Sequence, residues 1–316
     1  MDNNVLNDKK EIIKIAPADF EKIFNDDLSD YVKGKIEKYN LSYSNITASE
    51  RDVCIRKIVS ILLDTNLVAA GEHRLEQWES GWTENFEELV HSADPESVIP
   101  HYYGKYDIVR FDQKFIRPLS ERFEYYMLAT ILDWVFDKYL RDADFVYEFG
   151  CGTGHHLFRV RGVNPDADLW GLDWAAASQN IIRKIALEGI DPRMFAHRFD
   201  FFDPDMDFVL ESDAVVYTVA ALEQIGTRFG KFVSFLKKNR PRLCIHVEPI
   251  AELLDNDNLL DCLSIEYFKK RNYLSGFLTY LRELEARNEI EILKAQRTYI
   301  GSFFIEGYSL IVWKPL

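Results

Sequence analysis

The spacing of apolar residues changes near residue 144. Before that point apolar residues recur mainly at helical spacing, as at Phe20, Ile23, Phe24 and Leu28. After it, short apolar runs alternate with amphipathic segments, which is the pattern of a mostly parallel sheet covered by helices. The pattern therefore predicts a helical N-terminal part followed by an α/β domain.

Helical stretches are expected over 17–39, from Thr47 to Leu63, and over 67–90. Thr47 and Glu50 have the spacing of a capping box at the start of the second stretch. A strongly amphipathic helix is expected over 119–140. We therefore divide the chain into an all-helical unit over 1–100, a connecting segment over 101–118, and an α/β domain over 119–316.

Seven strands are expected in the α/β domain. They cover 145–149, 169–173, 194–199, 214–219, 243–247, 290–295 and 308–313. A helical insertion over 255–288 precedes the sixth strand, and Gly301 and Gly307 lie between the last two strands. The expected fold is a seven-stranded, mostly parallel Rossmann-like sheet whose last strand is antiparallel.

A glycine-rich motif joins the first strand to a helix. It reads Glu148-x-Gly150-x-Gly152-x-Gly154, and Asp173 ends the next strand. Glycines let the backbone turn sharply and approach a ligand, and a helix N-terminus supplies free amides. The dinucleotide fingerprint needs a small residue where this chain has His155, so a different nucleotide is indicated.

This arrangement resembles the class I S-adenosylmethionine-dependent methyltransferase family. The resemblance covers about 140–316, and extends to about 119 if the preceding helix is counted. It implies that the glycines pass under the methionine and ribose parts of the cofactor, and that Asp173 accepts hydrogen bonds from the ribose hydroxyls. It also implies that Asp200 accepts from the adenine amino group and that Phe201 flanks the ring, although an acidic loop before a proline turn also explains Asp200. The expected cofactor-binding residues are Glu148, Gly150, Cys151, Gly152, Gly154, Asp173, Trp174, Asp200, Phe201 and Thr218.

Three polar residues are candidates for the chemical step. Glu223 follows the fourth strand, and His246 and Glu248 end the fifth. Ligands of open α/β sheets lie beyond the carboxyl ends of the strands, and a histidine can take a proton from an acceptor hydroxyl. The alternatives are a structural histidine and a carboxylate at a helix start.

The segment 101–118 is rich in aromatic and basic residues and has no clear period. It is interpreted either as a packed surface connection or as a lid that excludes water from the reaction. The sequence assigns no role to Tyr102, Tyr103, Tyr106 or Arg110.

Acidic residues exceed basic residues by 52 to 38, giving a formal charge of −14. This charge opposes binding to nucleic acid or an anionic membrane and favours a small-molecule acceptor. The four cysteines have no metal-ligand spacing, so free thiols, no metal and a cytoplasmic location are expected. Neither a signal peptide nor a membrane span is expected.

The exit of the fourth strand reads Thr218-Val219-Ala220-Ala221 and lacks the Asn/Asp-Pro-Pro-Tyr motif of nitrogen-methylating family members. The sequence thus predicts methyl transfer to a small molecule, at an oxygen of a sugar or natural product. A protein or peptide methyltransferase and a catalytically silent binding protein are the alternatives. The oligomeric state stays open.

Overall fold

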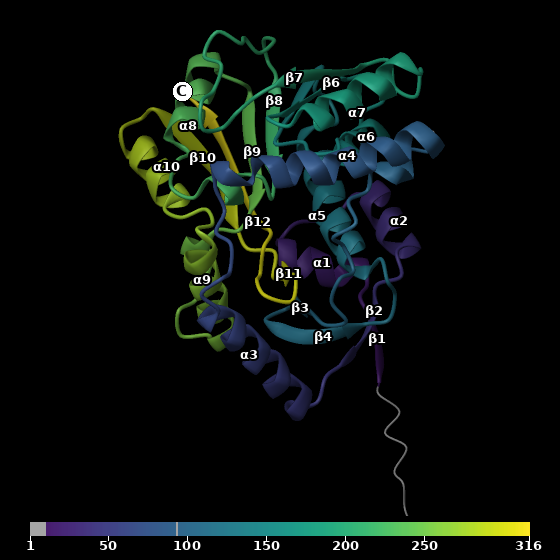
Figure 1. The fold of residues 1–316 in the computed structure, drawn as a ribbon, viewed down its shortest axis with the longest axis vertical. Helices are drawn as coiled ribbons and strands as arrows, with labels where there is room; N and C mark the ends of the chain where they lie inside the picture. The colour runs from purple at the N-terminus through teal and green to yellow at the C-terminus, as the bar shows by residue number, and fades with distance from the viewer. Residues whose placement is uncertain (1–10, 93) are drawn as a thin grey trace, which may run out of the picture.

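The computed structural model describes residues 11–92 and 94–316. Its main feature is a seven-stranded sheet in the order β10-β12-β9-β8-β5-β6-β7, in which β12 is antiparallel to both neighbours (Figure 1). The strands are β5 (Phe145–Phe149), β6 (Asp168–Asp173), β7 (Met194–Arg198), β8 (Val215–Val219), β9 (Leu243–Glu248), β10 (Ile290–Gln296) and β12 (Ser309–Pro315). The other pairs are parallel. This is the predicted seven-stranded, mostly parallel Rossmann-like sheet with its last strand antiparallel.

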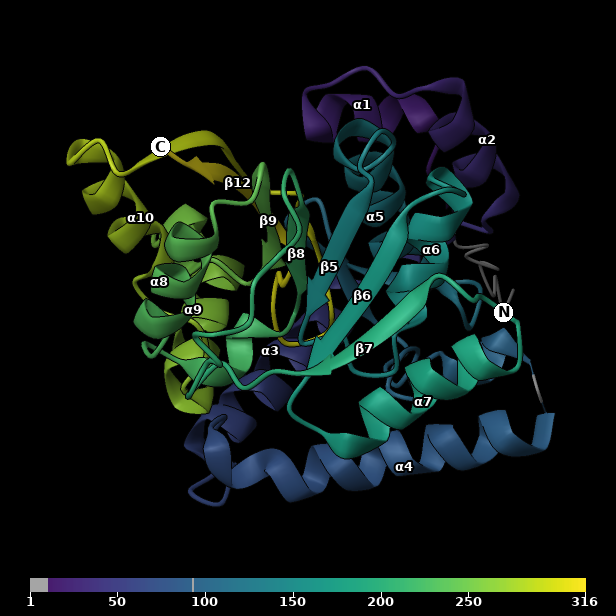
Figure 2. The same ribbon diagram turned by 90° about the horizontal axis from the view of Figure 1, so that it is seen from above.

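Helices cover both faces of this sheet (Figure 2). They are α5 (Phe123–Tyr139), α6 (His155–Val163), α7 (Ala176–Leu187), α8 (Gly230–Asn239) and α10 (Phe277–Ala286). Helix α9 (Leu259–Arg271) packs elsewhere, since its Leu260 and Leu263 share a cluster with Cys54 and Ile58. Successive strand residues point to opposite faces, so Val146 and Tyr147 belong to separate hydrophobic clusters. The first cluster contains residues of α5, α6 and α7, and the second contains residues of α8 and α10.

The N-terminal part is mainly helical, with α1 (Pro17–Phe24), α2 (Asp30–Lys38), α3 (Ala48–Leu63) and α4 (Leu75–Ser92). The expected capping box begins α3, where Thr47 and Glu50 exchange side chain–backbone hydrogen bonds of 2.7 and 3.2 Å. Short 3₁₀ turns are η1 (Glu72–Arg74), η2 (Pro95–Val98), η3 (Leu222–Ile225) and η4 (Ala251–Leu253).

The expectation of an all-helical unit over 1–100 needs correction, because this part also forms two strands. β1 (Ile12–Lys14) and β2 (Ser42–Asn45) belong to a second sheet of order β1-β2-β4-β3-β11. Its remaining strands are β3 (Val109–Phe111), β4 (Lys114–Pro118) and β11 (Ile300–Gly301). The segment expected as a lid or connection therefore contains a β-hairpin.

Asp112 and Gln113 form the turn of this hairpin, with φ of 49° and 58°. Two-residue hairpin turns use positive φ, usually through Asn-Gly or Asp-Gly. Because Asp-Gln lacks a glycine, this turn could not be predicted from the usual hairpin dipeptides. Among the described residues, no helix is long and apolar enough to cross a membrane.

Candidate active site

The glycine loop after β5 is tied to β6 by its backbone. The amides of Gly150 and Cys151 donate to the carbonyl of Leu172, at 2.7 and 3.0 Å. The amide of Gly152 donates to the carboxylate of Asp173 at 2.9 Å. The loop therefore stands at the carboxyl ends of two parallel strands, where ligands of open α/β sheets bind.

Two of the glycines allow a close approach that a side chain would prevent. Gly150 has φ of +71°, and a Cβ there would lie 2.4 Å from the Cβ of Ala221. A Cβ on Gly152, whose φ is +53°, would lie 3.0 Å from the indole of Trp82. Gly154 instead faces Ile182 of α7, so it serves helix packing rather than the pocket.

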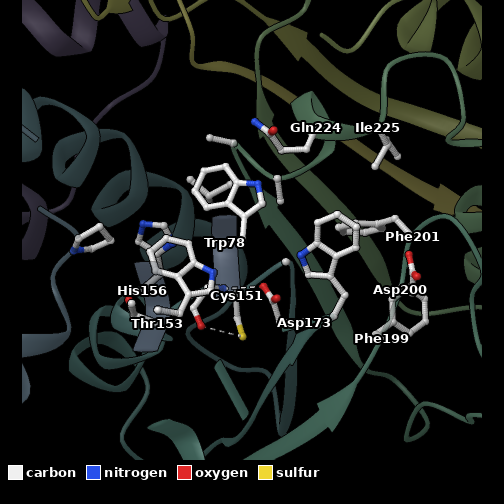
Figure 3. Close-up of a pocket in the computed structure, with 18 of the residues that line it drawn as sticks. Trp78, Cys151, Thr153, His156, Asp173, Phe199, Asp200, Phe201, Gln224 and Ile225 are labelled. Atoms are coloured by element: carbon white, nitrogen blue, oxygen red, sulfur yellow. Dashed lines mark hydrogen bonds between the residues drawn. The ribbon is translucent and has the colours of Figure 1, made fainter. Parts of the chain in front are cut away.

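A pocket opens above the loop and encloses about 750 Å³, with the solvent at its mouth included. Figure 3 shows Thr153 and His156 on one side, Phe199, Asp200 and Phe201 on the other, and Asp173 between them. Seven of the ten residues expected to bind the cofactor line this pocket: Gly150, Cys151, Gly152, Asp173, Trp174, Asp200 and Phe201.

Asp173 is held at the base of the pocket. Its two carboxylate oxygens accept from the amides of Gly152 and Ala175, both at 2.9 Å. Burial raises the pKa of Asp173 to about 6, and these two hydrogen bonds oppose that rise. Near neutral pH the side chain is an ionised, fixed hydrogen-bond acceptor, which suits a vicinal diol.

Three residues expected to bind the cofactor lie away from the pocket lining. Gly154 packs against α7 as described above, and Thr218 is fully buried beside His246. Glu148 is 1% exposed and contacts the ring of His156 and the hydroxyl of Tyr217. Glu148 thus lies behind the pocket wall, where it contacts the lining residue His156.

Helix α4 covers the pocket, which the sequence did not indicate. Trp78 and Trp82 line it and stack on each other with ring centroids 5.4 Å apart. Their helical spacing is the same as that of ordinary core residues, so the sequence does not distinguish these two pocket residues from core residues. Glu79 lies between them in sequence and accepts from the amides of Ala176 and Ala177, at 2.7 and 2.9 Å. It fixes α4 to the start of α7.

We expect Glu79→Ala to remove this anchor. Loss of a helix N-terminal acceptor costs about 0.5–2 kcal/mol. Unfolding stability should fall by that amount, and affinity for S-adenosylhomocysteine should fall because the tryptophan cover loosens. Urea unfolding and titration calorimetry check both effects, with the exposed Glu76→Ala on the same helix as control. Equal affinity in the two variants would contradict a role for α4 as the cover.

Only part of the segment 101–118 reaches the pocket. Tyr102 lines it and is 49% exposed. Tyr103 packs edge-on against His155, and Tyr106 stacks on Phe303. Arg110 is buried and donates to the carbonyls of Leu260 and Phe303 and to Ser264. Arg110 is structural.

His246, expected to take part in the chemical step, lies away from the pocket. The residue is fully buried, and both ring nitrogens are occupied: Trp313 donates to Nε2 at 2.9 Å, and Nδ1 lies 3.0 Å from the hydroxyl of Thr218. Burial lowers the pKa of His246 to about 3. It is a neutral core residue of β9 and does not line the pocket.

Glu248 also has a structural position. Its carboxylate accepts from the amides of Ala221, Leu222 and Glu223, at 3.0, 3.1 and 3.3 Å. These amides begin η3, so Glu248 caps this turn and fixes the exit of β8. The catalytic assignment is therefore not supported for Glu248, which acts by holding Glu223 and Ala221 in place.

We expect His246→Ala to destabilise the fold without changing the site. The substitution leaves a cavity and an unpaired indole N–H, which together cost about 2–4 kcal/mol. Chemical denaturation should show this loss, whereas the exposed His91→Ala should be neutral. An intact fold with wild-type stability but lost turnover would restore His246 as a catalytic residue.

Glu223 does not line the pocket itself, but its sequence neighbours Ala221 and Gln224 do. It is half-buried in η3, between the pocket residues Ala221 and Gln224, and accepts from the side-chain amide of Gln224 at 2.8 Å. Burial, and secondarily the nearby Glu248, raises the pKa of Glu223 to about 8. Among the described residues, no group of three or more His, Cys, Asp or Glu is placed to hold a metal ion.

No protein-family model and no curated protein matches the chain. Similar solved structures include an O-methyltransferase from neocarzinostatin biosynthesis, crystallised with S-adenosylmethionine and a naphthoic acid. It is 17% identical, covers 76% of this chain and 70% of its own, and has a TM-score of 0.42. Geranyl diphosphate methyltransferase with sinefungin is 14% identical over 78% of this chain and 98% of its own, with a TM-score of 0.45.

A putative O-methyltransferase from Nostoc punctiforme is 12% identical over 83% of this chain and 68% of its own, with a TM-score of 0.45. The sequence identities and TM-scores of these structures are low. The fold assignment therefore rests on the strand order and directions of the seven-stranded sheet.

Proposed function

We propose that this chain transfers a methyl group from S-adenosylmethionine to an oxygen of a small-molecule acceptor. The observation that carries the proposal is the pocket at the carboxyl ends of β5 and β6, where the glycine loop and Asp173 meet. The close backbone approach at Gly150 and the fixed carboxylate of Asp173 suit a nucleoside lying across the strand ends.

The residues present fit this cofactor. Asp173 would hold the ribose hydroxyls, while Phe201 and Asp200 would flank the base at the far end of the pocket. When bound, the cofactor supplies a methyl group activated by a sulfonium. The chain must then orient the acceptor. Good orientation lowers the activation barrier by on the order of 7–11 kcal/mol.

Glu223 is the proposed proton acceptor. It follows β8 between the pocket-lining residues Ala221 and Gln224, and its raised pKa of about 8 suits proton transfer from a hydroxyl near neutral pH. The tryptophans of α4 and Tyr102 close over the pocket and would exclude water, which favours a small acceptor over a folded protein.

Two measurements test the proposal in sequence. Titration calorimetry should show binding of S-adenosylhomocysteine and no binding of a nicotinamide dinucleotide. Labelled S-adenosylmethionine with a panel of phenols, sugars and carboxylic acids should then show transfer. Absence of nucleoside binding would refute the site, and binding without any transfer, extended to peptides, would favour a silent binding protein.

A further inference from the structure

Arg74 is a buried arginine in contact with two residues that line the pocket. It belongs to η1 and is 8% exposed. Its guanidinium donates to the side-chain oxygens of Gln77 and Gln224, at 2.9 and 3.4 Å, and lies 5.2 Å from the ring centroid of Trp78. Gln224 and Trp78 line the pocket (Figure 3). Among the described residues its hydrogen-bond partners are thus neutral amides, although a buried charge is costly unless an opposite charge accompanies it.

A second arginine, at the end of α9, is brought to the same place by backbone contacts. The amide of Ala70 donates to the carbonyl of Arg271 at 2.6 Å, and the side chain of Asn272 donates to the carbonyl of Ala70 at 3.2 Å. These bonds fix the chain before η1 against the end of α9. The guanidinium of Arg271 donates to the carbonyl of Val68 and lies 5.4 Å from the ring centroid of Tyr273.

The Nε atom of Arg271 is buried and has no hydrogen-bond partner among the described residues. Buried polar atoms are nearly always paired, so this nitrogen indicates a position for an acceptor oxygen. A guanidinium presents its donors as a planar fork that matches the two oxygens of a carboxylate. Arg74 and Arg271 together therefore form a candidate site for an anion.

The charge balance around Glu223 favours a single negative charge on this anion. Burial lowers the pKa of Arg74, and the charge of Arg271 lowers it further. Both arginines oppose the rise in the pKa of Glu223 that burial causes. Gln224 connects these groups, since its side-chain amide donates to Glu223 at 2.8 Å and its oxygen accepts from Arg74. Glu248 is occupied by three backbone amides, so two arginines and one ionised Glu223 are balanced by one further monoanion.

Tyrosines lie around the same groups. Tyr273 and Tyr308 are half-buried, and Tyr273 packs on the guanidinium of Arg271. Burial raises the pKa of both hydroxyls, and the charge of Glu223 adds to each rise, so both hydroxyls lie near that carboxyl group. Tyrosine rings pack on planar apolar groups and present a hydroxyl at one end. These surroundings suit a ring that carries both a hydroxyl and an anionic group.

We propose that Arg74 and Arg271 bind a carboxylate of the methyl acceptor, and that the acceptor is an aromatic hydroxy acid whose hydroxyl faces Glu223. The inference rests on the proposed function, because it assigns the acceptor of the same reaction. A neutral phenol or sugar would leave both guanidinium groups without a negative partner. The arginines would therefore select acids over neutral acceptors, because a site with unpaired buried polar groups discriminates strongly against a ligand that cannot pair them.

Matched acids and amides isolate the charge. Protein saturated with S-adenosylhomocysteine is titrated with the isomeric hydroxybenzoates and with the hydroxybenzamides of the same shape. We expect the best acid to bind at least about 10-fold more tightly than its amide. Arg271→Gln should weaken the acid about 10–100-fold and leave the amide and S-adenosylhomocysteine within about twofold. Arg271→Lys keeps the charge without the fork and should have an intermediate affinity. Arg282→Gln, an exposed arginine on α10, is the control.

Several results would overturn the inference. Equal affinity for acids and amides, or binding of neither, would show that the arginines do not form an acceptor site. Equal weakening of acid and amide by Arg271→Gln would show a structural role for this arginine. Methyl transfer to neutral phenols or sugars alone, at the same rate in Arg271→Gln, would leave the proposed function standing and refute the acid acceptor. Failure of the unaltered protein to bind S-adenosylhomocysteine would instead refute the proposed function.

Discussion

Glu223→Gln is expected to lower turnover by about 10²–10⁴-fold, because a positioned general base contributes that factor. Affinity for S-adenosylhomocysteine should stay unchanged, since glutamine keeps the size of the side chain and an oxygen for Gln224. The measurement is the rate of labelled methyl transfer, once an acceptor is identified from the panel.

The pH profile gives a second readout of the same residue. A carboxylate accepts a proton only when ionised, so turnover of the unaltered protein should rise as the pH rises toward the Glu223 pKa of about 8. Glu223→Gln should lose this rise. Glu211→Gln, an exposed carboxylate before the other end of β8, is the matched control. Wild-type rates and an unchanged profile in Glu223→Gln would remove Glu223 from the chemistry.

Asp173→Asn should weaken S-adenosylhomocysteine binding by about 1–3 kcal/mol, roughly 5–150-fold. The amide replaces one acceptor oxygen with a donor, which faces an amide hydrogen of Gly152 or Ala175 and loosens the glycine loop. Titration calorimetry near neutral pH measures the loss. Asp168→Asn, at the opposite end of the same strand where Asp168 pairs with Arg193, should bind normally.

The affinity should also depend on pH. Protonation removes acceptor capacity from Asp173, so binding by the unaltered protein should weaken as the pH falls through about 6. Asp173→Asn has no proton to gain at this position and should lack this dependence. Tight binding by the variant, with the same pH dependence as the unaltered protein, would place the ribose elsewhere.

Much of the α/β domain was predictable because its signals are local. β5 has the predicted bounds, since an apolar run that stops at a glycine marks both ends of a buried strand. Asp173 was singled out because it ends the strand after such a motif, and it lines the pocket. The insertion over 255–288 is helical as expected, in α9 and α10.

The errors concern contacts between distant segments. His246 and Glu248 were correctly placed at the end of a strand. However, the sequence does not show that Trp313 donates a hydrogen bond to His246, or that the amides of η3 donate to Glu248. The cover formed by Trp78 and Trp82 depends on Glu79 meeting the start of α7, far away in sequence. Such pairings are set by tertiary packing, which periodicity does not encode.

The connection between β10 and β12 crosses from one sheet to the other, because β11 pairs with β3. Phe20, Phe24 and Ile36 from the first helices also share a hydrophobic cluster with Val146 and Ile245. The boundary drawn at residue 118 therefore separates segments that depend on each other. A fragment starting at residue 119 would lack the N-terminal share of this cluster and leave β11 without its partner. We therefore expect the described N-terminal helices and the α/β domain to unfold in one transition.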